Sequence, residues 1–391
     1  MRRTNPTLIV LLFFLSVFIF FTLSYLFYSE PTHDYTRYMK QWDNILSGMN
    51  PWANKSNTYG PIHSYLVYLY QFHWNLPRIL FCVLYFISSL YISLRIYKNA
   101  LMDETTKTII YIMLFFNPLF WVFGLKFGIN DFMMAFFVVF GLIFYRNKFD
   151  ILAGLFFTVA ILTKFMPVVM LPFLIVYRTQ KIRFRFLFTL SYLVSSLFIL
   201  GLSYLSWGDK MLNPLIHVAE RKSKVLSIFR FFRGDASPLR LIMNNPNIDW
   251  LSIYLCLASL VIFYAISIKY RFNNILSSIT AFLLLLTFYK VGHLQFYITP
   301  VLLLLLWVSL DYGKIVRIRF VLTSVYLFII WISFVSFLYI ISSKLREARW
   351  REILGLPNFL ISAFLIIMLI IYQYYNRISI DKSTGPFEDS S

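Results

Sequence analysis

Cysteine is almost absent from this sequence of 391 residues, which contains only two. Both of them, Cys82 and Cys256, lie inside long apolar runs. A disulfide framework or a thiolate metal site needs several cysteines at suitable spacing, so we expect neither here. The two thiols are expected to pack among apolar side chains.

Charged residues are also scarce, at 14% of the chain, whereas 59% of the residues are hydrophobic and 20% are aromatic. Such a chain, with a mean hydropathy of +0.70, cannot present an ordinary polar surface to water. A helix needs roughly 20 apolar residues to cross the hydrocarbon core of a bilayer. The sequence therefore predicts an all-α, polytopic transmembrane protein of about 12 spans (10–13). The spans are expected to begin near residues 7, 77, 107, 128, 151, 166, 186, 250, 274, 295, 320 and 357.

We place all spans in one membrane domain, residues 1–377, followed by a polar cytoplasmic tail at 378–391. The first apolar run, Thr7 to Tyr28, follows Met1-Arg2-Arg3 as a signal peptide would. It is too long for a simple signal peptide and lacks a small-residue cleavage site, so we expect a retained membrane anchor.

Several motifs that bind nucleotides or catalytic metals are missing, namely G-x-x-x-x-G-K-S, G-x-G-x-x-G, H-E-x-x-H and G-x-S-x-G. Their absence argues against a nucleotide-sugar donor held in a soluble α/β domain. The formal net charge of +19 could indicate nucleic acid. However, no soluble domain with a basic face or stacking platform is predicted, so we expect no nucleic-acid partner.

Basic residues in the short loops predict the orientation of the chain, because such residues gather on the cytoplasmic side. They fall at alternate span ends: Arg2/Arg3, Arg95/Lys98, Arg146/Lys148, Arg178/Lys181/Arg183/Arg185, Lys269/Arg271, Lys314/Arg317/Arg319 and Arg377. We expect those ends and both termini on the cytoplasmic side of a bacterial inner (plasma) membrane. The polar segments on the opposite side are then 29–75, 124–131, 206–249, 290–294 and 341–356.

The segments on the outside carry more positive charge than this rule favours. An anionic partner would explain the excess, and in a membrane protein the best candidates are anionic lipids or a lipid phosphate. The cations concerned are Lys126, Lys164, Arg221, Lys222, Lys224, Arg230, Arg233, Arg240 and Lys290.

The first outside segment begins with a predicted amphipathic helix that would lie in the membrane interface, because Tyr35, Tyr38 and Trp42 recur at helical spacing. Asp34 stands where the first span meets this polar segment, next to His33. A carboxylate there suits a general base, although it could simply cap the helix that follows. Further along, the aromatic residues of N-P-W and T-Y-G-P could contact a sugar ring or could belong to an interfacial belt.

At this point the sequence resembles a known group. The order D-Y-x-x-Y, a helix, G-x-N-P-W and T-Y-G-P is similar to the first luminal loop of GT-C glycosyltransferases. It most resembles glycosyltransferase family 87 and the mannosyltransferase that adds the first mannose of glycosylphosphatidylinositol anchors. The stretches GLKFGINDFMMAFFVV and LAGLFFTVAILTKFMPVVMLPFLIV extend the resemblance, which covers roughly residues 1–180. Beyond them, hydropathy and one H-x-x-x-Y (His293, Tyr297) support it.

The resemblance implies an inverting glycosyltransferase that moves a hexose, mannose above all, from a polyprenyl-phosphate donor to a lipid-linked or glycolipid acceptor on the non-cytoplasmic face. Asp34 would be the general base. Some relatives have a second acidic residue two positions earlier, where this chain has Thr32. We therefore expect neither an essential metal nor another cofactor.

Candidates for binding the donor phosphate or sugar share the face predicted for Asp34: Lys126, Asp131, Lys164, Lys290, His293, Arg230 and Arg233. Candidates for placing the acceptor or the loop are His33, Arg37, Trp52 and Tyr59. The lysines could instead snorkel to the interface. Asp131 could be a second acidic group of the site, or a helix-end residue paired with Lys126.

Two other protein classes would show similar features. A lipid-linked glycan flippase or transporter also has many spans and cationic pockets, but it often shows internal repeats, and none are evident here. A polysaccharide polymerase or ligase depends on a large outer loop, which could only be the segment 206–249.

Overall fold

The structure is a computed structural model, and it describes residues 6–27, 30, 33–53, 57–175, 182–214, 224–233, 237, 248–341 and 353–383. The first half of this chain forms α1 (Pro6–Phe27), α2 (His33–Leu46), α3 (Pro61–Tyr65), α4 (Val67–Phe72), α5 (Leu76–Lys98), α6 (Glu104–Phe115), α7 (Pro118–Trp121), the π-helical turn η1 (Val122–Phe127), α8 (Asp131–Arg146), α9 (Asp150–Thr163), η2 (Met166–Met170) and α10 (Leu171–Ile175).

The second half forms α11 (Ile182–Trp207), η3 (Gly208–Leu212), β1 (Lys224–Val225), α13 (Ile228–Arg233), α15 (Ile248–Tyr270), α16 (Asn274–Phe288), β2 (Val291–Gly292), η4 (Leu294–Tyr297), α17 (Ile298–Ile315), α18 (Arg319–Ile341) and α20 (Gly355–Ser383). The predicted helical architecture is confirmed. The one pairing of strands in the described chain is short and parallel, with Lys224 opposite Val291 and Val225 opposite Gly292.

Helix starts follow local capping chemistry. The Asp103 carboxylate accepts a hydrogen bond from the Thr106 backbone N–H at 2.9 Å where α6 begins. Asn117 and Asn273 accept in the same way at the starts of α7 and α16, at 2.9 and 3.1 Å. Each side chain satisfies a backbone donor that the first helical turn leaves without a partner inside the helix.

Eight helical stretches of the described chain are long and apolar enough to cross a membrane: Ile9–Leu26, Leu76–Lys98, Glu104–Gly124, Phe186–Met211, Trp250–Tyr270, Leu294–Ile315, Arg319–Tyr339 and Gly355–Arg377. The predicted number of about 12 is not confirmed. At the other four predicted positions α8, α9 and α16 have 16, 14 and 15 residues, and Met166–Ile175 is shorter still. Each is shorter than the roughly 20 residues that a perpendicular span requires.

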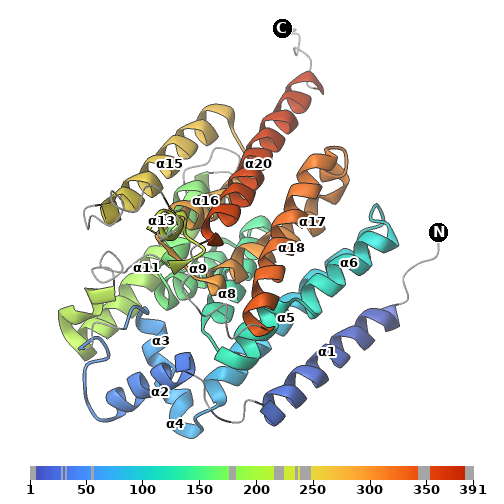
Figure 1. Cartoon of the computed structure of the whole chain (residues 1–391). Helices are drawn as coiled ribbons and strands as arrows, with labels where there is room; N and C mark the ends of the chain where they lie inside the picture. Colours follow the sequence, from blue (N-terminus) through green and yellow to red (C-terminus); the bar gives the residue numbers. More distant parts are fainter. Residues whose placement is uncertain are drawn as a thin grey trace.

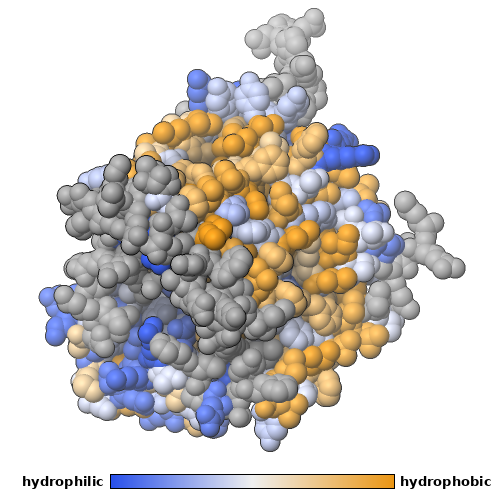
Figure 2. Space-filling view, in the orientation of Figure 1, coloured by the Kyte–Doolittle hydropathy of each residue, from blue (hydrophilic) through white to orange (hydrophobic). Residues whose placement is uncertain are grey.

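The helices form layers around α8 and α17. α8 packs between α5, α9 and α17, and α9 packs in turn against α11. α17 lies in the interior, whereas α1 lies at the edge with side chains such as Phe14 and Phe18 exposed at 63% and 69%. Figure 2 shows hydrophobic residues in a broad zone across one face, with hydrophilic residues above it and at its lower left. Exposed apolar surface of this extent indicates contact with lipid.

The bundle has two distinct ends. α2, α3 and α4 lie together at one end, while α1 begins and α20 finishes at the other (Figure 1). The predicted amphipathic helix is present as α2, whose Tyr35, Tyr38 and Trp42 are at most 1% exposed. Cys82 and Cys256 are free and buried, as expected from their apolar surroundings.

Candidate active site

Asp34 lies in the first turn of α2 and is partly buried. Tyr38 follows one helical turn later on the same side of the helix, and its hydroxyl donates to Asn130 Oδ1 at 3.3 Å. Burial raises the pKa of Tyr38 well above its ordinary value, and Tyr59, Asp131 and Asp34 raise it further. The carboxylates of Asp34 and Asp131 therefore both act on the same phenol, although they come from different helices.

Asp131 is the first residue of α8 and is fully buried. Its Oδ1 accepts from the Lys164 ammonium at 2.6 Å, which forms an ion pair between the start of α8 and the end of α9. Its Oδ2 is buried and accepts no hydrogen bond from the residues that the structure describes. The pair thus leaves one carboxylate oxygen with unused acceptor capacity.

Lys164 is 7% exposed, so it does not snorkel to the interface as the alternative interpretation allowed. Its Nζ lies 4.4 Å from the ring centroid of Phe296 and 5.9 Å from that of Tyr59. Aromatic faces on two sides and a carboxylate on another stabilise a buried ammonium. The structure therefore brings together Asp34, Asp131, Lys164 and Tyr59, all of which the sequence had marked as site candidates.

His63 occupies the centre of this cluster and is fully buried. Its ring lies 4.5 Å from that of Tyr59 and 4.6 Å from that of Tyr38, centroid to centroid. Its Nδ1 is 3.1 Å from the Asn130 side-chain nitrogen, and Trp42 Nε1 donates to its backbone carbonyl at 3.0 Å. Since an amide nitrogen can only donate, the imidazole Nδ1 must accept and its proton must sit on Nε2.

The imidazole stays neutral. Burial lowers the pKa of His63 to about 3, and the positive charge of Lys164 lowers it in the same direction. Within the described part of the chain no atom bonds to its Nε2. This N–H is a donor that a bound polar group could use.

Gly60 fixes the T-Y-G-P segment against the end of α9. Its backbone N–H donates to the Thr163 carbonyl at 3.1 Å. A Cβ atom at this position would lie 2.1 Å from the Leu162 carbonyl oxygen, so no larger residue fits. The close approach places Tyr59 beside Lys164.

Trp52 holds the same loop from the other side. It is 1% exposed, and its Nε1 donates to the Tyr59 carbonyl at 3.0 Å. Its ring packs edge-on against Trp207 at 5.4 Å, and Asn50 Nδ2 donates to the Trp207 carbonyl at 2.5 Å. Trp52 therefore positions the loop and offers no open face for a sugar ring.

Arg78, near the start of α5, is a cation of this region that sequence reasoning missed. It is 5% exposed, and its Nη2 donates to Ser24 Oγ at 3.1 Å. Gly128, at φ +53°, packs on its side chain, because a Cβ there would lie 2.8 Å from Arg78 Cγ. The backbone N–H of Arg78 donates to the Tyr35 hydroxyl at 3.3 Å, which joins this arginine to the start of α2.

Arg78 also lines a cavity of about 450 Å³ between α1 and α5. The cavity opens beside exposed apolar groups such as Tyr25 and Ile79, which are 78% and 38% exposed. Its other lining residues are Phe20, Phe21, Ser24, His73, Trp74, Asn75 and Cys82. It combines an apolar wall with one guanidinium.

Lys290 and His293 flank β2, and Lys290 is buried at 1% exposure. The His293 ring packs edge-on against Phe296 at 5.3 Å, and Phe296 in turn lies under Lys164. His293 thus adjoins the cluster through one aromatic side chain, Phe296. Arg230 and Arg233 lie farther along, in the short α13, which packs against α20.

Arg37, His33 and Lys126 are the remaining predicted site residues. Arg37 is exposed on α2. His33 begins α2 and Lys126 lies in η1, but the side chains of both are outside the described part of the structure, as are residues 342–352 and most of 206–249. Among the described residues no group of three or more His, Cys, Asp or Glu side chains could hold a metal ion.

His63, Asn130 and Arg78 were not singled out from the sequence. His63 stands three residues after Gly60 and Asn130 directly precedes Asp131, so polar residues beside motifs already noted were the available signal. Arg78 gave a weaker signal, as a single cation at the start of an apolar run.

A sequence comparison assigns the chain that has this site to a family. The model of glycosyltransferase family 87 matches residues 57–308, more than half of the chain, and includes His63, Asn130, Asp131 and Lys164. No curated protein matches the sequence. The match extends well beyond residue 180, where the motifs ended, but begins after Asp34. The chain, a glycosyltransferase rich in apolar membrane-type helices, belongs to glycosyltransferase family 87.

Proposed function

We propose that this enzyme transfers a hexose, mannose first among them, from a polyprenyl-phosphate donor to a hydroxyl of a lipid-linked or glycolipid acceptor. Transfer takes place on the non-cytoplasmic side of the membrane and inverts the anomeric centre. The observation that carries the proposal is that Asp34 lies close enough to the buried Asp131–Lys164 pair for its charge to act on Asp131, at one end of the bundle.

Asp34 is the general base. The acceptor hydroxyl attacks the anomeric carbon, its proton passes to Asp34, and the bond from that carbon to the donor phosphate breaks. Asp34 suits this step because it is partly exposed and can meet an acceptor, whereas Asp131 is fully buried and already paired. The two carboxylates therefore have different roles.

Arg78 neutralises the leaving phosphate. A guanidinium presents several donors to phosphate oxygens, and a site of low dielectric strengthens the interaction as negative charge develops. The apolar wall between α1 and α5 suits a polyprenyl chain that enters from the lipid. Lys164 adds positive charge and holds the buried Asp131 carboxylate in place beside the site. His293 supports this region through Phe296, and Lys290, three residues earlier, is a further buried cation.

A flippase or a polymerase would use the same features differently. A flippase needs the cations for binding but needs no base, and a polymerase moves whole glycans. The half-buried carboxylate beside a buried ion pair supplies the base that transfer needs and a flippase does not.

The test measures the transfer of radiolabelled hexose from a polyprenyl-phosphate hexose to membrane lipids by the purified protein. The wild type and Asp34→Asn are compared at equal amounts of folded protein. We expect turnover to fall by roughly 10²–10⁴-fold, the usual contribution of a general base. Asp43→Asn is the matched control: it makes the same change on the same helix, and the amide oxygen can still accept from Tyr70.

Full activity of Asp34→Asn, or no transfer from any polyprenyl-phosphate sugar, would favour the flippase or polymerase alternative. Inversion is tested separately by the anomeric configuration of the product.

A further inference from the structure

The opposite end of the bundle contains a second polar cavity, of about 480 Å³, that has no part in the proposed reaction. α8 separates the two places, since Asp131 begins this helix of 16 residues and Arg146 ends it. At 1.5 Å per residue the two residues lie roughly 22 Å apart. By the distribution of basic residues, this second end is the cytoplasmic one.

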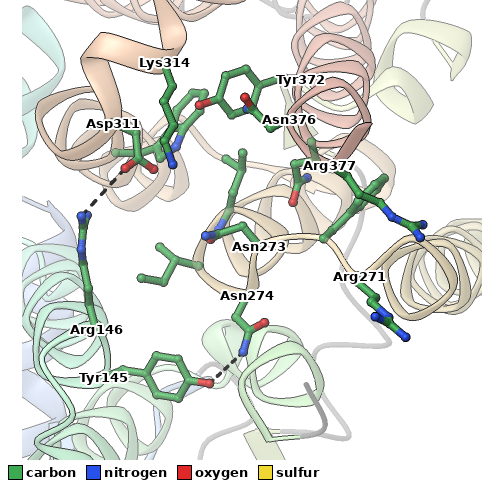
Figure 3. A pocket seen from close by; sticks show the side chains of 15 residues that line it. Tyr145, Arg146, Arg271, Asn273, Asn274, Asp311, Lys314, Tyr372, Asn376 and Arg377 are labelled. Atoms are coloured by element: carbon green, nitrogen blue, oxygen red, sulfur yellow. Dashed lines mark hydrogen bonds and ion pairs between the residues drawn. The ribbon is translucent and has the colours of Figure 1, made fainter. Parts of the chain in front are cut away.

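The lining of the cavity is strongly basic. Four cations, Arg146, Arg271, Lys314 and Arg377, come from four different segments, and Asp311 is the one acid among the 15 lining residues. Figure 3 shows Arg146 on one side, where it reaches Asp311 at 3.9 Å, and Arg271 and Arg377 on the other, with Lys314 between them. Three of these cations, Arg146, Arg271 and Lys314, already outnumber the one carboxylate of the lining, so the cavity attracts an anion.

The floor of the cavity has buried polar atoms that lack partners. Asn274 and Gln373 are 5% and 4% exposed. Asn274 Nδ2 donates to the Tyr145 hydroxyl and Gln373 Oε1 accepts from Ser277, as far as the described residues show. Asn274 Oδ1 and Gln373 Nε2 bond to nothing in the described chain. Buried polar atoms without partners carry a substantial free-energy cost, which a ligand would remove.

These two atoms specify the chemistry of the ligand. Gln373 Nε2 needs an acceptor, such as a phosphate oxygen, and Asn274 Oδ1 needs a donor, such as a hydroxyl. The start of α16 lies in the same wall, and the positive end of its helix dipole adds to the attraction for an anion. One ligand class meets all three demands: a phosphate ester that also carries hydroxyls.

We propose that this cavity binds a hydroxylated phosphate ester on the cytoplasmic side, at a site separate from sugar transfer. The group can come from the glycerol-phosphate headgroup of an anionic lipid or from a soluble glycerol or sugar phosphate. Basic pockets between membrane helices on this side suit such headgroups.

Binding is measured on the purified full-length protein with three probes: dioctanoyl phosphatidylglycerol, sn-glycerol 3-phosphate and dioctanoyl phosphatidylcholine. The first or the second is expected to bind, and the zwitterionic third to bind at least tenfold more weakly. Lys314→Gln and Arg377→Gln, each tested alone, should raise the Kd about fivefold, the effect of one basic residue at a membrane surface. Lys98→Gln, an exposed cation of α5 outside the cavity, should leave the Kd unchanged.

Binding of the lipid alone would identify a bilayer headgroup as the source, and binding of glycerol phosphate alone would identify a soluble metabolite. Binding of both would mean that the site recognises the phosphate and hydroxyls without the acyl chains. Equal binding of phosphatidylcholine, no binding of either anionic probe, or a Kd unchanged in both cavity variants would overturn the proposal. None of these measurements involves sugar transfer, so they stand apart from the test of Asp34.

Discussion

At the scale of single residues, the buried pair of Asp131 and Lys164 combines a structural and a functional demand. Each charge is costly to remove from water, and their mutual attraction offsets the cost only while both are present. In this protein both charges are present, and Lys164 Nζ lies 2.6 Å from Asp131 Oδ1. The pair is therefore expected to affect both stability and transfer, and suitable variants can separate the two effects.

Lys164→Met should destabilise the fold by about 3–5 kcal/mol, because it leaves the Asp131 carboxylate buried without its cation. The double variant Asp131→Asn with Lys164→Met should recover most of that loss and yet remain inactive in transfer. Thermal unfolding in detergent measures the first effect and the hexose-transfer assay the second. Lys210→Met, which removes an exposed lysine of η3, is the control and should match the wild type in both. If the double variant is as unstable as the single one, the charge imbalance is not the cause.

The buried His63 makes the stability of the fold depend on pH. Its pKa is lowered to about 3 by burial, whereas an unfolded histidine takes up its proton near pH 6.5. Between these values the unfolded chain binds one more proton than the folded chain, so stability is lost as the pH falls through this window. The contribution approaches about 1.4 kcal/mol for each pH unit.

His63→Gln removes this contribution. Between pH 6 and pH 4 the stability of the wild type should therefore fall more steeply than that of the variant. Unfolding free energies of the two proteins, measured across this range in the same buffer series, test the expectation. Parallel curves would mean that His63 is protonated in the folded protein.

At the scale of elements, Gly60 joins the first polar segment to α9. Gly60→Ala would bring its methyl group to 2.1 Å from the Leu162 carbonyl oxygen, a backbone atom that has little freedom to move. We expect a loss of about 1–3 kcal/mol, the usual cost of overpacking, and a large loss of transfer as Tyr59 moves away from Lys164. Thermal unfolding and the transfer assay measure the two effects.

The matched control is Gly201→Ala in α11, where an added Cβ meets no atom of the described chain within 4 Å. Alanine favours a helix over glycine, so this variant should be neutral or more stable by up to about 1 kcal/mol. Wild-type behaviour of Gly60→Ala would show that the segment can shift without consequence.

Helix types were easier to predict than helix lengths. Long apolar runs such as that of α5 are unambiguous, and eight of them are long enough to cross a membrane. Hydropathy could not reveal that α8, α9 and α16 are short, because residues of their faces such as Met134, Phe157 and Phe282 pack in the interior. An apolar run has the same composition whether it faces lipid or other helices.

In the candidate site, too, some residues could be predicted from the sequence, whereas their contacts could not. Asp34, Asp131, Lys164 and Tyr59 were recognisable because charged or aromatic residues stand next to turn motifs at the ends of apolar runs. Their pairing was not, since Lys164 meets Asp131 across the packing of α8 on α9. The contact of Arg78 with Gly128 and the place of His63 between two tyrosines likewise depend on long-range packing that sequence spacing does not encode.

At the scale of the whole molecule, the two ends of the bundle have different chemistry. One end holds the carboxylates, the buried ion pair and the aromatic loop, and the other holds the basic cavity and the ends of α1 and α20 (Figure 1). The loop cations Arg146, Arg271, Lys314 and Arg377 at the second end follow the pattern that keeps basic loops in the cytoplasm. The orientation of the chain therefore decides on which side of the membrane transfer takes place.

Labelling of single cysteines tests this orientation. Ser47 and Asn147 are both exposed. Ser47 lies just after α2, which contacts the start of α8, whereas Asn147 lies just after the end of α8, so the two mark opposite ends of the bundle. In intact cells a membrane-impermeant maleimide should label Ser47→Cys, and it should label Asn147→Cys only after the membrane is permeabilised. The native Cys82 and Cys256 are buried, so the wild type supplies the unlabelled background. The reverse pattern would place Asp34 on the cytoplasmic side and would require a donor whose sugar phosphate faces the cytoplasm. Labelling of both variants in intact cells would mean that the chain does not separate these two ends across the membrane.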